Sequence, residues 1–135
     1  MATGQPGVVE SLASRRGANW ALPRTSRSAV PISRTVQIVV RQDRLVIVPD
    51  RGAASSGPAS GIEVPIPGRT VAAVDRFIST LWDHIATWGI AGKGMYWRPV
   101  VHLHAAPDAA WRADQLKKLL DGSGLELVDK GAVVR

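Results

Sequence analysis

Two of the three histidines, His102 and His104, alternate with apolar residues in the stretch RPVVHLHA at residues 98–105. Side chains two positions apart on a strand share a face and lie about 6.6 Å apart, so this pair could supply two imidazole nitrogens to a metal. The third histidine, His84, falls in an expected helix on the other side of the sheet, and catalytic zinc needs three protein ligands. We therefore expect no metal site. The pair would be surface histidines or part of a pH-responsive interface.

The stretch WGIAGKGMYWRP at residues 88–99 places three glycines and one lysine between aromatic residues. A phosphate-binding loop reads GxxxxGK followed by Ser or Thr, and it leads from a strand into a helix. Here Thr87 stands where the first glycine should be, and Gly94 replaces the hydroxyl residue. The stretch also leads from an expected helix into an expected strand, so no helix N-terminus would face an anion.

We expect the same stretch to be a turn between two packed elements. Gly89 suits the position after a helix C-terminus, because glycine adopts the left-handed conformation at low cost. The large side chains of Met95, Tyr96 and Trp97 would cover the end of the core near Trp88.

No group of residues in the sequence predicts an enzyme. The chain has no cysteine, which excludes disulfides, thiolate nucleophiles and cysteine metal sites. Asp108 and Asp114 are six positions apart on an expected helix and do not share a face. We expect no catalytic residue, no metal and no cofactor.

The net charge of +6 is concentrated near the N-terminus, because residues 1–34 hold five arginines and one acidic residue. Gly, Ser, Ala and Pro dominate the same stretch, which predicts a mostly disordered basic arm over 1–34 and one folded domain over 35–135. Trp20 and Leu22, in NWALP at 19–23, interrupt the polar composition. They predict a point where the arm docks on the domain or on a partner.

No apolar run approaches the roughly 20 residues that a membrane-spanning helix needs. The N-terminus also lacks the apolar stretch of a secretory signal. We therefore expect a cytoplasmic protein without a membrane span.

Apolar periodicity predicts most of the secondary structure. Residues 35–48 predict a β-hairpin with its turn at Gln42-Asp43. Residues 62–67 predict an edge strand, because Pro65 cannot donate a backbone hydrogen bond. Apolar spacings of three and four predict a helix over 70–88 with Thr70 as its N-cap. The remaining elements are expected as a strand at 98–105, a helix between Pro107 and Gly122, and a strand at 125–128.

Two helices must cover one face of one small sheet in this order of elements, which predicts an α+β two-layer sandwich. The sheet would be mixed, and its topology ferredoxin-like or a related split topology. Alternation along the hairpin and the strand at 98–105 then assigns side chains to the face without helices. The residues expected on this interaction face are Val39, Arg41, Arg44, Val46, Val48, Val100, His102 and His104.

Two resemblances are carried by short motifs and by the order of elements. The strings NWALP (19–23), WGIAGKGMYWRP (88–99) and LLDGSGL (119–125) resemble an uncharacterised bacterial family associated with planctomycetes, which implies no activity. The order of elements over about residues 35–130 resembles the soluble domain of ExbD/TolR proteins. That family has a membrane helix with a proton-carrying aspartate, which this sequence lacks, so the resemblance implies partner binding or dimerisation and not proton coupling.

These observations favour a non-enzymatic protein-interaction domain, an accessory or assembly module for another protein or for a second copy of itself. The alternative is a basic nucleic-acid-binding domain, because open sheets with basic and aromatic residues bind single strands by stacking. The expected helix-free face contains Arg41 and Arg44 but no aromatic residue, so nucleic acid is the less favoured partner.

Overall fold

The computed structural model describes residues 11–23, 28–48 and 61–132. Its strands are β1 (Val30–Val40), β2 (Arg44–Val48), β3 (Ile62–Pro65), β4 (Met95–Ala105) and β5 (Glu126–Ala132). Its helices are α1 (Ala13–Arg16), α2 (Val74–Ala86) and α3 (Ala110–Leu119), with short 3-10 turns η1 (Thr70–Ala73) and η2 (Pro107–Ala109) leading into α2 and α3.

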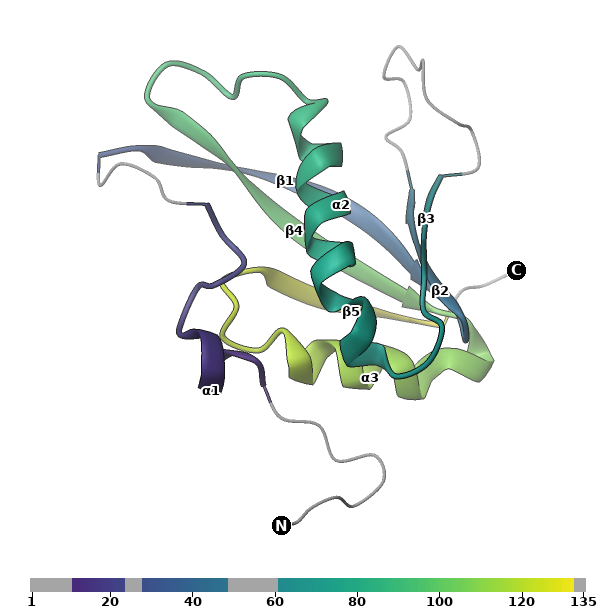
Figure 1. Cartoon of the computed structure of the whole chain (residues 1–135). Coiled ribbons are helices and arrows are strands. Elements are labelled where there is room, and N and C mark those ends of the chain that lie inside the picture. The colour runs from purple at the N-terminus through teal and green to yellow at the C-terminus, as the bar shows by residue number, and fades with distance from the viewer. Residues whose placement is uncertain (1–10, 24–27, 49–60, 133–135) are drawn as a thin grey trace.

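The strands form one mixed sheet in the order β3-β2-β1-β4-β5. Strand β2 is antiparallel to both β1 and β3, while β1, β4 and β5 are parallel. The connections from β3 to β4 and from β4 to β5 both step in the same direction across the sheet. Right-handed connections of this kind put both helices on one face, as Figure 1 shows for α2 and α3.

The predicted α+β two-layer sandwich with a mixed sheet is therefore confirmed. A ferredoxin-like topology has the order β-α-β-β-α-β, whereas this chain has β-β-β-α-β-α-β. The predicted hairpin register is also confirmed, since Ile38 pairs with Ile47 and Val40 with Leu45. The edge position predicted for the strand that contains Pro65 is confirmed as β3.

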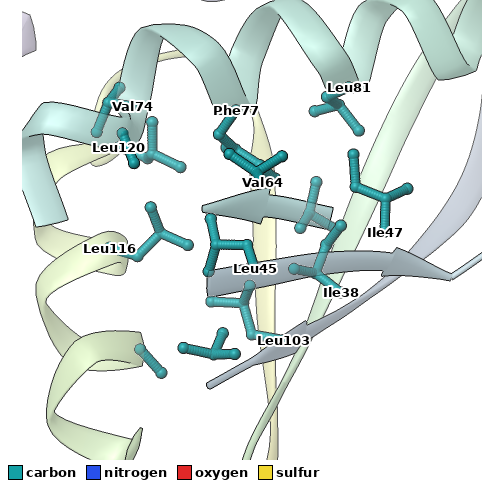
Figure 2. Close-up of a cluster of buried hydrophobic side chains, with 14 of the residues drawn as sticks. Ile38, Leu45, Ile47, Val64, Val74, Phe77, Leu81, Leu103, Leu116 and Leu120 are labelled. Atoms are coloured by element: carbon teal, nitrogen blue, oxygen red, sulfur yellow. The ribbon is translucent and has the colours of Figure 1, made fainter. Parts of the chain in front are cut away.

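The core lies between the helices and one face of the sheet (Figure 2). The central strands contribute Ile38 and Leu103, and Phe77 and Leu81 of α2 pack over them, all without exposed surface. The predicted apolar stripe did not include Phe77; its members were Val71, Val74, Ile78, Leu81, Ile85 and Trp88. The first of these, Val71, is exposed on η1. The buried stripe is rotated toward Phe77, which is the largest of the fully buried side chains.

The two ends of α2 differ from the prediction. Thr70 is not an N-cap, because its hydroxyl donates to Oε1 of Gln115 at 2.5 Å and so links η1 to α3. The helix ends at Ala86 rather than at residue 88. Gly89 has a φ of 82°, the left-handed conformation expected after a helix end.

The sheet also begins earlier than predicted, because β1 starts at Val30 and not at the expected domain boundary of residue 35. Strand β4 likewise starts at Met95 instead of residue 98. The residues added to β4 pair in parallel with residues added to β1, from Val30 opposite Met95 to Ile32 opposite Trp97. Backbone pairing thus overrides the weak strand propensity of residues such as Ser33.

Part of the predicted arm is folded onto the domain. Residues 1–10 and 24–27 of that arm lie outside the described residues, but residues 11–23 contain α1 and a turn. The backbone amides of Leu12 and Ala21 donate to the carbonyls of Leu119 and Ser123, each at 3.0 Å. The indole nitrogen of Trp82 donates to the carbonyl of Ala21 at 2.8 Å. The chain segment 11–23, called the N-terminal segment below, is therefore part of the helical layer.

The side chains of Trp20 and Leu22 are partly buried against the core, so the structure places both on the domain itself. Leu22 fits against Gly124, which has a φ of 97°. A Cβ atom at Gly124 would lie 2.6 Å from two carbon atoms of the Leu22 side chain. The docking of the N-terminal segment therefore requires glycine at this position.

We expect Gly124→Ala to lower the free energy of unfolding by about 2 kcal/mol, because it combines an unfavourable φ with a steric clash. The measurement is urea denaturation followed by circular dichroism. Gly68→Ala is the matched control, since Gly68 lacks a positive φ and a Cβ there would meet no atom within 4 Å. In a Leu22→Ala background, Gly124→Ala should cost less, because the clash is removed. An equal cost in both backgrounds would contradict this packing.

Candidate functional site

The sheet face opposite α2 and α3 is not covered by any described element. Pairing across the strands arranges its side chains in rows, because partners in register share a face. Val39 lies between Val46 on β2 and His104 on β4. Gln37 lies between Val48 and His102 in the next row. We call this surface the helix-free face. The structure brings together Val39, Val46, Val48, Val100, His102 and His104 on it.

The two predicted arginines lie at one border of the helix-free face. Arg41 follows β1 in the exposed turn, where its amide donates to the carbonyl of Arg44 at 2.9 Å. The guanidinium of Arg44 is 3.3 Å from the carboxylate of Glu63 on β3 and 3.4 Å from that of Asp43. These ion pairs are partly exposed and are worth little as stabilising contacts. They place one positive and two negative side chains next to each other at this edge of the helix-free face.

The apolar centre is smaller than the sequence predicted. Val46 is only 8% exposed, so it contributes little surface to a partner. Gly61, the residue before β3, lies against it: a Cβ there would be 2.9 Å from Cγ1 of Val46. Val39, Val48 and Val100 remain half-buried and form the accessible apolar part.

Strand β5 adds a part of the helix-free face that was not predicted. Val128 pairs with His102, and Glu126 pairs with Val100. Lys130 lies near enough to influence the ionisation of His102. The alternation of Glu126, Val128 and Lys130 was the available signal, but only the strand order shows that β5 lies beside β4.

The two histidines differ in their surroundings. Nε2 of His104 lies 2.5 Å from Oε1 of Gln37 on β1. Partial burial lowers the pKa of His102, and the positive charges of Lys130 and His104 lower it further. Glu126 acts in the opposite direction and raises this pKa. In the described part of the chain, no cluster of three or more His, Cys, Asp or Glu side chains is placed to hold a metal ion.

The glycine-rich stretch is the turn that links α2 to β4. The indole nitrogen of Trp97 donates to the carbonyl of Gly89 at 2.8 Å. The rings of Trp88 and Trp97 meet edge to face with centroids 5.4 Å apart. The guanidinium of Arg34 lies 4.4 Å from the ring centroid of Trp88. The aromatic residues therefore brace the end of the β1–β4 pair, and their faces contact protein groups.

An open groove of about 450 Å³ lies on the helical side of the molecule. It is lined by Ser11, Asp114, Lys117, Lys118 and Asp121. Lys117 already pairs with Asp129 at 2.7 Å and with Asp114 at 3.4 Å, and the hydrogen bond to Asp129 raises its pKa. Two of the charged side chains that line this groove, Lys117 and Asp114, are therefore already engaged in ion pairs.

No helix in the described ranges is long and apolar enough to cross a membrane. Comparisons of the chain with protein-family models, curated proteins and solved structures found no match.

We expect the folded protein to lose stability as the pH falls below about 6.5, partly through His102. The folded state holds the pKa of His102 below its ordinary value of 6.5, so the unfolded chain binds this proton first. The contribution of neutral His102 to the free energy of unfolding is fully present at neutral pH. It declines as the pH falls and the unfolded chain takes up this proton. Urea denaturation at several pH values should show a weaker acid dependence for His102→Gln than for the wild type. Identical pH profiles would contradict this assignment.

Proposed function

We propose that this chain is a non-enzymatic interaction domain that binds another protein, or a second copy of itself, through the helix-free face. The observation that carries the proposal is a five-stranded sheet with helices on one face only. The uncovered face has half-buried valines at its centre and charged residues at its borders. An apolar centre with a polar rim is the usual anatomy of a protein interface.

The dimensions of the sheet support a partner that also contacts the rims. Five strands spaced about 4.8 Å apart and about 20 Å long give a face of roughly 500 Å². A stable interface buries about 800 Å² on each partner, so the valines alone are insufficient. The charged groups of Arg44, Glu63, Glu126 and Lys130 would then take part and select the partner by charge.

The resemblance in element order to the soluble domain of ExbD/TolR proteins favours an envelope or transport assembly as the setting. This support is an analogy of fold, so the function rests on the face itself. An accessory or assembly role follows, because the described face offers a binding surface and no cluster of reactive side chains.

The alternative, binding of nucleic acid, has less support. Single-stranded nucleic acids bind sheets by stacking bases on exposed aromatic rings. The helix-free face carries valines, histidines and Gln37 at its centre, and the alternation of β4 adds one aromatic residue, Tyr96, near the start of this strand. The rings of Trp88 and Trp97 are packed against each other and Arg34 at another place.

We expect Val48→Glu and Val100→Glu to weaken association by about tenfold or more, because each would bury an unpaired carboxylate in the interface. Both side chains are half-buried, so the variants should fold, whereas glutamate at Val46 would disturb the sheet. Val71→Glu is the matched control, since Val71 is 38% exposed on η1, on the helical side. Sedimentation equilibrium over a wide range of concentration measures self-association, and circular dichroism checks folding.

A partner of different sequence is tested with the same variants. Wild type and Val71→Glu, immobilised, should retain a protein from an extract of the source cells that Val48→Glu and Val100→Glu do not retain. If neither self-association nor capture changes in the two face variants, the helix-free face is not the interface. Binding to an oligonucleotide that both face variants lose would favour the nucleic-acid alternative.

A further inference from the structure

The first half of β1 and the first half of β4 form a ribbon that projects from the sheet. The two strands pair from Val30 opposite Met95 onward, but β2 pairs with β1 only from Gln37 and β5 with β4 only from Val100. Residues 30–34 and 95–99 therefore have no described strand on their outer edges. Figure 1 shows this ribbon extending away from the other strands, with the α2–β4 connection at its end.

Large apolar side chains are exposed at the end of the ribbon. Ile90 is 90% exposed, Val30 51% and Met95 45%. The other two large apolar residues with high exposure among the described residues, Val71 and Trp111, lie apart from it near the starts of α2 and α3. We call Val30, Ile90 and Met95 the apolar tip.

Hydrogen bonds hold the apolar tip in place. The amide of Met95 donates to the carbonyl of Gly92 at 3.0 Å, and the amide of Val30 donates to that of Gly94 at 2.9 Å. The indole of Trp97 holds the carbonyl of Gly89, directly before Ile90. The connection is therefore anchored on both sides of Ile90, and the exposure of this side chain is built into the turn.

The surroundings of the apolar tip are basic and aromatic. Lys93 and Arg98 are exposed, and Arg34 lies over the rings of Trp88 and Trp97 at 4.4 and 5.5 Å from the centroids. The sequence contains no Asp or Glu between residues 11 and 42 or between residues 84 and 107. The segments that build the ribbon and its connection thus contribute positive charge and no carboxylate.

We propose that the apolar tip inserts into the interface of a lipid bilayer that contains anionic lipids. Exposed apolar side chains next to basic residues are the combination that binds a membrane surface without crossing it. Lys93 and Arg98 would contact anionic headgroups, while Ile90, Val30 and Met95 would enter the boundary between headgroups and acyl chains. The membrane would be a second binding partner, distinct from the one on the helix-free face.

The chemistry of the tip favours a bilayer over nucleic acid. The most exposed residue, Ile90, is aliphatic and cannot stack on a base. The Trp97 indole nitrogen is engaged with Gly89, and its ring packs on Trp88, so neither is presented for base contact. Bilayer insertion uses both the apolar and the basic residues, whereas a phosphate backbone would use only the basic ones.

The test is flotation of the full chain with vesicles of phosphatidylcholine containing phosphatidylglycerol, compared with vesicles of phosphatidylcholine alone. Wild type should bind the anionic vesicles. Ile90→Ser should weaken this binding by about tenfold, because most of an isoleucine side chain leaves water on insertion. The double variant Lys93→Gln/Arg98→Gln should weaken it by about thirtyfold, since each basic residue near an anionic surface is worth about fivefold in affinity.

Two matched controls separate the apolar tip from general hydrophobicity and charge. Trp111→Ser removes an exposed apolar side chain on α3, which follows the opposite end of β4. The double variant Arg69→Gln/Lys118→Gln removes the same charge from exposed positions away from the ribbon. Both controls should bind vesicles like the wild type, and circular dichroism should be the same for all variants.

Three results would overturn the proposal. The first is absence of binding to anionic vesicles by the wild type. The second is unchanged binding in Ile90→Ser, which would mean that charge elsewhere on the chain holds the vesicle. The third is binding of a single-stranded oligonucleotide, measured by fluorescence anisotropy, that depends on Lys93 and Arg98 without vesicle binding. That result would assign the ribbon to nucleic acid.

Discussion

The parallel pairing of β1 with β4 is the constraint on which the rest of the structure depends. It extends over the full length of both strands, from Val30 opposite Met95 to Val40 opposite Ala105, and lies at the centre of the sheet. Parallel neighbours cannot be joined by a tight turn, so the chain must leave the sheet and return through a helix. Because both crossovers proceed in one direction, the helices share one face. On the opposite face of the sheet, the exposed surface is made by side chains of the strands.

Much of the fold could be predicted because its elements have strong local periods. The alternation of Ile38, Val40, Leu45 and Ile47 was sufficient for the hairpin and its register. The docking of the N-terminal segment could not be predicted in the same way. Its backbone amides donate to backbone carbonyls at the end of α3 and in the turn that follows. Every residue has a backbone carbonyl, so residue types do not indicate such contacts. The early start of β1 was hidden because strand propensity there is weak and tertiary pairing decides.

The part of the helix-free face that follows from the alternation of side chains along single strands could be predicted. Side chains two apart stay on one face, so Val39, Val100 and the two histidines could be grouped without a structure. The contact of Gly61 with Val46 depends on the placement of β3 beside β2, and the position of Val128 depends on strand order. The projecting ribbon depends on a difference in length between neighbouring strands, which no single segment reveals. The organisation of the surface is thus a property of the assembled sheet.

The attachment of the N-terminal segment also has a consequence for the order of folding. The Ser11 hydroxyl donates to the carbonyl of Asp121, 110 residues later, and the contact of Trp82 with Ala21 spans 61 residues. Closing such long loops costs entropy before any contact is gained, and contacts distant in sequence slow folding. A chain emerging from the ribosome holds residues 11–23 long before the turn at 119–123 exists. This segment therefore makes these contacts only after α3 and the turn at 119–123 have been made.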